Sequence, residues 1–313
     1  MLNRHCQYGW TKQAICQKWG ISLQTFYVIK PVNETSLNRR RIQLNTITPF
    51  EREAIRSYAL SHTEQNHREL AYRMLDEDIV GVSPSTVYRI LKEYHLIRQR
   101  AKKEKIDIWH PHQSVNRPDQ VWQTDLMCLI FQQREYYLLS YVDVYSRFTV
   151  YHQLCLIMTG DSIRQASRKA IKQTSIVPES IQSDNGSCYI SQEYRSLMKQ
   201  LEIDHRLIHP HCPNENAEIE RYHRTVRELV DVTDATTVTE LEELIKERIY
   251  YYNYIRYHSR IGFIPPYVKY RGNPEQIFEE RKKKLERAKV KRMKINAQKI
   301  LSNKPKIYLT NVQ

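Results

Sequence analysis

Apolar residues recur at two different spacings along the chain, and each spacing predicts its own kind of element. In the first part, helical spacing predicts helices over residues 51–60, 67–75 and 83–91. Ser83 followed by Pro84 is a strong start signal for the last of these, because serine caps a helix and proline suits its first turn. This part of the chain is therefore predicted to be helical.

From residue 121 the pattern changes to short runs that are rich in β-branched and aromatic residues. Runs at 121–130, 135–142 and 148–154 predict three strands short enough to be antiparallel neighbours. Further helices are predicted over 161–173, 191–201 and 216–230, with one strand ending near 183 and another at 203–208. Strands first, then alternating helix and strand, predict a mixed α/β sheet.

The amino-terminal segment has the pattern of a helix-turn-helix. Residues 11–19 place Ile15 and Trp19 on one helical face, Gly20 tolerates a positive φ, and Ser22 can cap a second helix that runs to residue 29. In that arrangement the groove-facing side chains would be Gln24, Thr25 and Tyr27. A helical hairpin used for protein contacts is the alternative.

The helices between residues 51 and 91 resemble a second helix-turn-helix, in which Arg89 and Lys92 would meet phosphates. A simple helical bundle is the alternative here. Polar, basic stretches without apolar periodicity precede and follow this segment, and they are interpreted as linkers.

The charge of the chain favours a polyanionic partner. The formal net charge is +14 over 313 residues, which indicates nucleic acid rather than a neutral small molecule. Residues 281–306 hold twelve lysines and arginines against one acid, Glu286. A solvated helix would explain such a run by itself, whereas a nucleic-acid partner would make it a contact with the DNA backbone.

The cysteines and the lengths of the apolar runs narrow the class of protein and its expected location. The six cysteines include no Cys-x-x-Cys pair, so neither a disulfide framework nor a zinc ribbon is indicated. No apolar run reaches membrane length, and residues 1–8 lack the apolar core of a signal peptide. A cytoplasmic or nucleoid location is therefore expected.

Three acids stand where chemistry is a better explanation than packing. Asp125 lies inside a predicted strand, where burial of a lone acid is costly, Asp184 follows a strand and precedes Asn185-Gly186, and Glu220 lies on a predicted helix. Each by itself could be an ordinary surface acid. Together, hard oxygen ligands suit Mg²⁺, and two such ions can assist displacement at a phosphodiester.

The helix that carries Glu220 offers further candidates. Asn216, Glu220, Arg224 and Arg227 are spaced so that they share one helical face, which would present an acid to metal and arginines to DNA phosphates. A solvated charged stripe is the alternative. Glu218 should point to a different side of this helix.

Asp143 is a rival acid near a strand end. Arg147, four residues later, offers it a local ion pair or a turn, so a structural role is assigned to Asp143.

The spacing of the three acids is specific. Fifty-eight residues separate Asp125 from Asp184, and 35 separate Asp184 from Glu220. This resembles the Asp-Asp-35-Glu pattern of retroviral integrases and bacterial insertion-sequence transposases. Five ordered segments are similar to motifs of that superfamily: 117–125, 143–147 with its Asp-x-x-Ser-Arg, 182–186, 216–221, and the Tyr-Asn...Arg-His run at 252–258.

The resemblance implies a ribonuclease H-like core, a mixed five-stranded sheet with flanking helices, preceded by helical DNA-binding units. The implied domains are 1–32, helix-turn-helix; 33–46, basic linker; 47–98, second helix-turn-helix; 99–116, linker; 117–255, catalytic core; and 256–313, basic carboxy-terminal DNA-binding or interaction region. Asp125, Asp184 and Glu220 would be both the catalytic residues and the ligands of two Mg²⁺ ions, for which Mn²⁺ can substitute.

The activity implied is that of a DNA transposase. It binds the ends of a mobile element, frees a 3′-hydroxyl with water, and joins that hydroxyl directly to target DNA without a protein nucleophile. A homo-oligomer on DNA is expected because two ends must be joined, and a second element-encoded protein is a candidate partner. The alternatives are a DNA-binding regulator derived from a transposase, and a metal-dependent nuclease without strand transfer.

Overall fold

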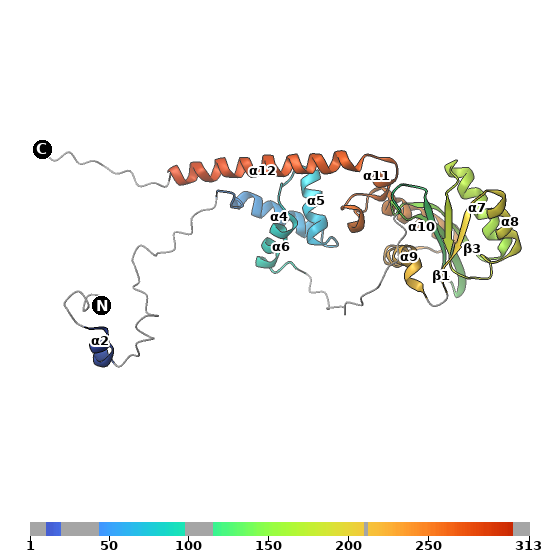
Figure 1. Cartoon of the computed structure of the whole chain (residues 1–313), viewed down its shortest axis with the longest axis horizontal. Helices are drawn as coiled ribbons and strands as arrows, with labels where there is room; N and C mark the ends of the chain where they lie inside the picture. The colour runs from blue at the N-terminus through green and yellow to red at the C-terminus, as the bar shows by residue number, and fades with distance from the viewer. Residues whose placement is uncertain (1–10, 20–43, 98–114, 210–211, 303–313) are drawn as a thin grey trace. The chain divides into compact units, whose positions relative to one another are not determined.

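The computed structural model describes residues 11–19, 44–97, 115–209 and 212–302. The chain falls into two compact units, residues 50–288 and residues 1–49 with 289–313 (Figure 1). The domain boundaries expected from the sequence stay a prediction.

In the larger unit, three helices are present where the apolar spacing predicts them. They are α4 (Pro49–Ser61), α5 (His67–Asp76) and α6 (Pro84–Glu93). Oδ1 of Asn66 caps α5 by accepting the backbone N–H groups of residues 68 and 69. Ser83 caps α6, and Pro84 lies in its first turn.

The five strands form one mixed sheet. In chain order they are β1 (Val121–Phe131), β2 (Arg134–Asp143), β3 (Thr149–Cys155), β4 (Ser180–Ser183) and β5 (Asp204–Leu207). The strand order is β3-β2-β1-β4-β5. The first three strands are antiparallel, while β4 and β5 are parallel to β1. This topology is ribonuclease H-like, so the predicted fold class is confirmed.

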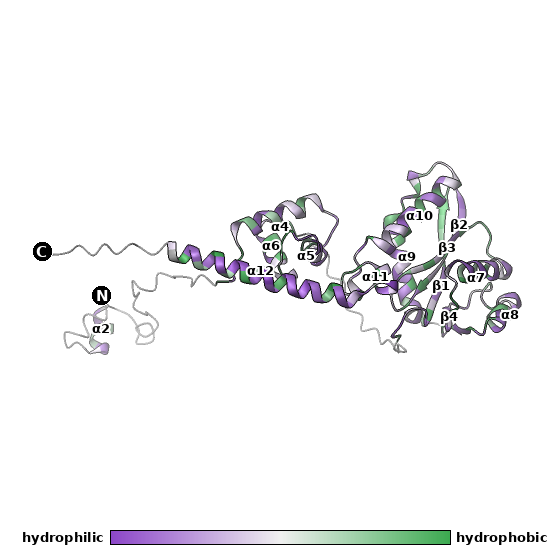
Figure 2. Ribbon diagram, turned by 90° about the horizontal axis from the view of Figure 1, so that it is seen from above, coloured by the Kyte–Doolittle hydropathy of each residue, from purple (hydrophilic) through white to green (hydrophobic). Residues whose placement is uncertain are grey.

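Helices cover both faces of the sheet (Figure 2). One face packs against α7 (Gly160–Thr174) and α8 (Gln192–Gln200), and the other against α9 (Ala217–Leu229) and α10 (Val238–Tyr254). Because side chains alternate along a strand, even positions of β1 such as Trp122 join the α7 side, and odd positions such as Met127 join the α9 side. Asp125 is at an odd position, so it belongs to the α9 side.

After α10 the chain continues through η4 (Ser259–Ile261), α11 (Pro266–Arg271) and α12 (Pro274–Ser302). The Tyr-Asn motif at the end of α10 has a structural explanation. The side-chain amide of buried Asn253 accepts from the N–H of Thr149 at 2.9 Å and donates to its carbonyl at 3.0 Å. This pair of bonds ties the end of α10 to the start of the edge strand β3.

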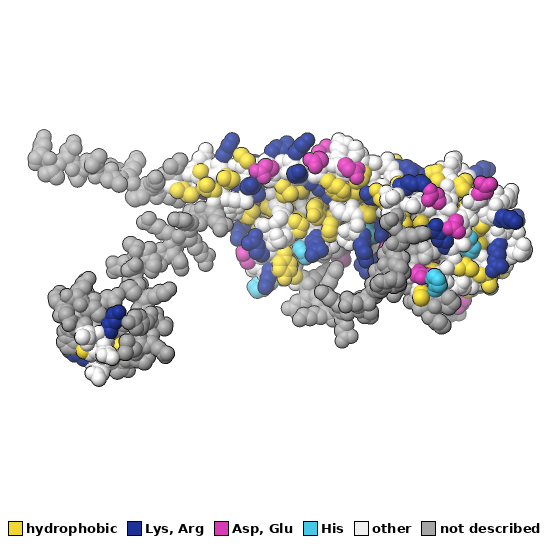
Figure 3. Space-filling view, viewed as in Figure 1, with side chains coloured by type: hydrophobic (Ala, Val, Ile, Leu, Met, Phe, Trp, Pro, Cys, Tyr) yellow, Lys and Arg dark blue, Asp and Glu magenta, His cyan; other side chains and the backbone are white. Residues whose placement is uncertain are grey.

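A second polar cluster joins α5 to the first part of α12. The guanidinium of Arg281 donates to both carboxylate oxygens of Asp76, at 2.8 and 2.6 Å, and to the carbonyls of Gly262 and Phe263. The hydroxyl of Tyr257 donates to the same carboxylate at 2.7 Å. Arg281 is 5% exposed, so the prediction that residues 281–306 contact DNA does not hold for this arginine. The helix still gathers exposed lysines and arginines along its length (Figure 3).

In the smaller unit, α2 (Lys12–Trp19) is the helix predicted over residues 11–19. Elsewhere in that unit, the side-chain amide of Asn296 on α12 donates to the carbonyls of Leu44 and Thr46 at 2.7 and 2.8 Å. The predicted groove-facing residues Gln24, Thr25 and Tyr27 lie outside the described residues. The first helix-turn-helix therefore stays a prediction.

Candidate active site

The parallel pairing of β1 with β4 sets two of the three acids side by side. Gln123 is opposite Gln182 at the last paired position. Asp125 follows Gln123 by two residues on β1, and Asp184 follows Gln182 by two residues, just after β4 ends at Ser183. The two acids are near enough for the charge of Asp125 to raise the pKa of Asp184. Since side chains alternate along a strand, Asp125 lies on the same face as Gln123. That face is the one covered by α9.

The two glutamines place the start of α9 over this face. Nε2 of Gln123 and Nε2 of Gln182 both donate to the carbonyl of Glu215, at 2.9 and 2.7 Å. Oε1 of Gln123 accepts the N–H of Ile219 at 3.0 Å. Glu220 directly follows Ile219. The backbone of the third acid therefore lies near the end of the sheet where Asp125 and Asp184 are found.

The acids differ in their surroundings. Asp125 and Asp184 are half-buried, whereas Glu220 is exposed. Within the described ranges, no three His, Cys, Asp or Glu side chains converge closely enough to hold a metal ion. Carboxylates that lie close together repel one another.

The pKa of Asp184 reports that repulsion. It is raised above the ordinary value first by burial and then by the charge of Asp125, although the N–H of Gly186 donates to Oδ1 at 3.0 Å and opposes the shift. A Cβ at Gly186 would lie 3.0 Å from that same oxygen, so glycine leaves room for the carboxylate. Bound divalent cations would relieve this excess of negative charge, and three carboxylates suit Mg²⁺.

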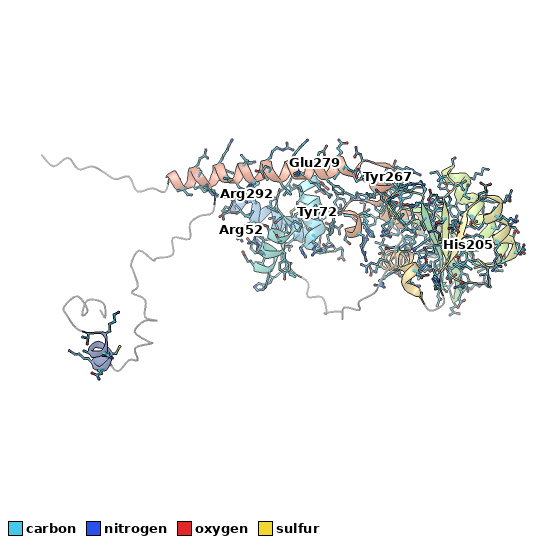
Figure 4. All side chains as sticks on the ribbon, in the orientation of Figure 1. Arg52, Tyr72, His205, Tyr267, Glu279 and Arg292 are labelled. Atoms are coloured by element: carbon cyan, nitrogen blue, oxygen red, sulfur yellow. The ribbon has the colours of Figure 1, made fainter. Side chains whose placement is uncertain are left out.

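One histidine contacts an acid directly, and another contacts the residue before an acid. Nδ1 of buried His223, one turn after Glu220, lies 3.5 Å from Oδ2 of Asp125. On β5, Nε2 of His205 lies 2.9 Å from Oγ of Ser183, the residue before Asp184 (Figure 4). Both histidines therefore flank an acid-bearing segment.

Asp143 stabilises the turn that follows β2, and Arg147 does not form an ion pair with it. Its carboxylate accepts the N–H and the hydroxyl of Ser146, at 2.8 and 2.5 Å, and the N–H of Asp119 at 2.8 Å. Burial raises its pKa to about 6 in spite of these bonds. Arg147 turns instead to Glu218, whose Oε2 is 2.7 Å from Nη1 of the arginine. Glu218 thus points to a different side of α9 from Glu220, as predicted.

The predicted DNA contacts on α9 separate into two groups. Arg224 and Arg227 are exposed, and in the described part of the chain neither makes a hydrogen bond or an ion pair. Asn216 does not share their open face, because it is 3% exposed. The reason is local: residues Pro213–Asn216 form the 3₁₀ helix η2, so the α-helical spacing begins only at Ala217.

On α6, Arg89 and Lys92 are exposed, while Val87, Ile90 and Leu91 face the helical core. The two basic side chains are thus placed for phosphates, and their contact with DNA stays a prediction.

Sequence reasoning missed Gln123, Gln182 and His223. The signal that could have found the glutamines is their position two residues before an acid on the same strand face, where a buried amide needs polar partners. His223 follows Glu220 by three residues, which places it near the same helical face. Only the tertiary structure identifies the partners of all three.

The fold and the paired acids define the class of protein as a ribonuclease H-like core with a carboxylate site. Two family profiles, both described as the integrase core domain, match this chain. One covers residues 115–213 and the other covers residues 201–266. Over these residues the chain is similar to retroviral-type integrases and to transposases of bacterial insertion sequences.

Similar proteins come from insertion sequences and from retroviruses. The chain is 26% identical over 218 residues to the insertion element IS476 uncharacterized 39.2 kDa protein of Xanthomonas euvesicatoria, covering 67% of this chain and 63% of that protein. It is 26% identical to the transposase for insertion sequence element IS904 of Lactococcus lactis, covering 56% of this chain and 70% of that one. A Gag-Pro-Pol polyprotein of human T-cell leukemia virus 3 is 31% identical over 113 residues, which are 36% of this chain and 8% of the polyprotein.

Among solved structures, the HTLV-2 integrase catalytic core domain in complex with magnesium is 20% identical, with a TM-score of 0.43, and covers 49% of this chain and 97% of that one. A simian T-cell lymphotropic virus intasome chain is 18% identical, with a TM-score of 0.46, and covers 69% of this chain and 73% of that one. In the part of the chain that the structure describes, no helix is both long and apolar enough to cross a membrane.

Proposed function

We propose that this protein is a DNA transposase of the integrase type, which cuts at the ends of a mobile element and joins the freed 3′-hydroxyl to target DNA. The observation that supports the proposal is the β1–β4 register, in which Gln123 is opposite Gln182, two residues before Asp125 and Asp184, while both glutamines bind the carbonyl of Glu215 just before the helix of Glu220. The match of residues 115–266 to the integrase core domain, and the similarity to an insertion-sequence transposase, support the same reaction.

In this reaction the three acids hold the cofactor. Asp125, on the central strand, would be a ligand to both Mg²⁺ ions, and Asp184 and Glu220 would each hold one. When bound, the ions supply activation of the attacking oxygen and neutralise charge on the phosphodiester. Mn²⁺ is expected to substitute, since it accepts the same oxygen ligands.

Other side chains orient the DNA. Arg224 and Arg227 are exposed and without protein partners among the described residues, so they are available for phosphates next to Glu220. Arg89 and Lys92 on α6 are suited to the backbone of the element's terminal repeat. A homo-oligomer on DNA is proposed because two ends must be joined in one event.

The test is an assay of joining. The full chain is incubated with Mg²⁺, a labelled duplex that carries the DNA flanking the coding sequence, and a target plasmid. Labelled duplex joined to plasmid, and lost in Asp184→Asn, is the expected result. Cleavage without joining would identify a metal-dependent nuclease, and binding without cleavage would identify a DNA-binding regulator; either result would overturn the proposal.

A further inference from the structure

The start of α9 has no cap of its own. Asn216 occupies the N-cap position but its side chain makes no capping hydrogen bond. The helices α5, α6, α7, α8 and α10 are all capped by the side chain of their own Asn, Ser or Thr. Because the first N–H groups of a helix lack partners within it, an uncapped start depends on contacts from elsewhere. For α9 these contacts come from the sheet.

Two glutamines, one buried and one half-buried, supply the first set of contacts. Gln123, which is 3% exposed, binds both ends of one turn, since it donates to the carbonyl of Glu215 and accepts the N–H of Ile219. Gln182 donates to the same carbonyl from the neighbouring strand. The first turn is therefore fixed to the two strands that carry Asp125 and Asp184, and not merely to one of them.

An arginine supplies the second contact, from the β2–β3 turn. Arg147 has a φ of 67°, in the left-handed region that few side chains adopt without strain. Its side chain is 15% exposed and lies 2.7 Å from Glu218, which is 12% exposed. Among the described residues, neither Nε nor Nη1 of Arg147 makes a well-oriented hydrogen bond.

This arrangement costs stability rather than adding it. A left-handed non-glycine residue is unfavourable, and a buried ion pair with incomplete hydrogen bonding recovers little of its desolvation cost. Asp143 holds the turn in place through its bonds to Ser146 and to the N–H of Asp119. Strain of this kind is maintained where it positions functional groups.

We infer that Gln123, Gln182 and Arg147 are positioning residues that fix the first turn of α9 and thereby set Glu220 against Asp125 and Asp184. Residues 215, 218 and 219 are held by side chains from three different segments of the sheet. Glu220 follows directly and keeps an exposed carboxylate. The inference rests on the proposed function, because it assigns these residues to the placement of its third metal ligand.

The experiment compares Gln123→Met and Gln182→Met with Gln200→Met. Methionine keeps the length of the side chain and removes its hydrogen bonds. Gln200 is exposed at the end of α8, where its side chain accepts from Arg168, so it is the matched control. Mg²⁺ affinity is measured by calorimetry on the full chain, and the exchange of the Ile219 amide proton is measured by hydrogen exchange.

Gln123→Met is expected to speed exchange at Ile219 and to weaken Mg²⁺ binding by about 10- to 100-fold, the range found when residues that orient metal ligands are lost. Gln182→Met removes only one of two donors to the Glu215 carbonyl, so a smaller loss is expected, and it serves if Gln123→Met does not fold. Mg²⁺ affinity equal to that of the control in both variants would overturn the inference.

The ion pair is tested by exchange of its charges. Arg147→Glu and Glu218→Arg should each weaken Mg²⁺ binding, and the double variant should recover part of the loss because attraction is restored. A double variant as weak as the sum of the two single changes would contradict a role for the pair. A wild-type chain that binds Mg²⁺ but joins no DNA would sink the proposed function alone, since Mg²⁺ affinity and hydrogen exchange are read without DNA.

Discussion

Two buried polar networks in this protein are built from similar groups and have opposite outcomes. At the start of α9, Gln123 and Arg147 bind Ile219 and Glu218, the two residues before Glu220, and the carboxylate of Glu220 remains exposed. At the junction of α5 and α12, Arg281 and Tyr257 direct all their bonds at Asp76 and at nearby carbonyls. In the first network the carboxylate of Glu220 stays exposed. In the second, the charge of Arg281 is neutralised by the carboxylate of Asp76.

A buried charged cluster is therefore not by itself a functional site. Both networks contain an arginine and an acid drawn from segments far apart in the sequence. Only the one at α9 leaves an acid, Glu220, without a basic partner among the described residues, directly after a helix turn that is bonded to the strands preceding Asp125 and Asp184. Mg²⁺ binds through carboxylate oxygens, so an unpaired, exposed carboxylate is available to it. Substitutions in both networks, and at the basic positions around them, test this distinction.

The largest effect is expected for Asp125→Asn at the open site. Joining should fall by at least about a thousand-fold, because several kcal/mol of charge stabilisation are lost with the shared ligand. The free energy of unfolding should stay the same or rise, since the charge of Asp125 also opposes ionisation of Asp184. Gel assays of joining and urea unfolding measure the two. A marked loss of stability would mean that Asp125 is needed for folding and is not primarily a metal ligand.

Substitutions in the network around Asp76 should lower the free energy of unfolding and leave Mg²⁺ binding unchanged. Asp76→Ala leaves the guanidinium of Arg281 buried without its anion, so the free energy of unfolding should fall by about 3–5 kcal/mol. The double variant Asp76→Leu with Arg281→Met should lose less, because no charge is left unpaired. Mg²⁺ affinity should not change in either. A stable Asp76→Ala with weakened Mg²⁺ binding would erase the distinction between the networks.

The exposed arginines of α9 should affect DNA binding and not folding. Arg224→Ala and Arg227→Ala should each weaken binding and lower the slope of log affinity against log salt by about 0.9 for each phosphate that the variant no longer neutralises. Lys282→Ala, at an exposed position of α12, tests the basic stretch in the same way. Titrations at several salt concentrations measure these slopes, and an unchanged slope for both arginines would remove them from the DNA interface.

The smallest effect is a pH dependence from the tail motif. Burial, and then the charges of Arg147 and Arg256, lower the pKa of His258 to about 3. The folded state therefore keeps this histidine neutral, while the unfolded chain binds a proton below about pH 6.5. Its contribution to stability is full above that value and is lost as pH falls toward 3, by up to about 1.4 kcal/mol per pH unit.

The measurement compares unfolding of the wild type and His258→Gln at pH 7 and pH 5. The difference between the two proteins is the useful quantity, because Asp143 has a raised pKa of about 6 and contributes a slope of the opposite sign. The wild type should lose more stability than His258→Gln on acidification. Equal losses would mean that His258 is protonated in the folded protein.

Most of the fold could be predicted from the sequence because its signals are local. Alternating strands and capped helices depend on neighbours within a few residues, as at Ser83 and Pro84, and they are present where expected. The site was less predictable. The α-helical spacing placed Asn216 beside Glu220, but a 3₁₀ turn at Pro213–Asn216 breaks that spacing, and Asn216 is buried.

The sequence by itself determined the order of the elements, the three candidate acids and the family, because these depend on residue type and on spacing along the chain. The tertiary structure decided which of the many charged side chains face one another. Arg147 follows Asp143 by four residues but forms its ion pair with Glu218. Arg281 belongs to a basic run in the sequence but is buried against Asp76. Such choices depend on contacts between strands and helices far apart in the sequence, which spacing along one segment does not encode.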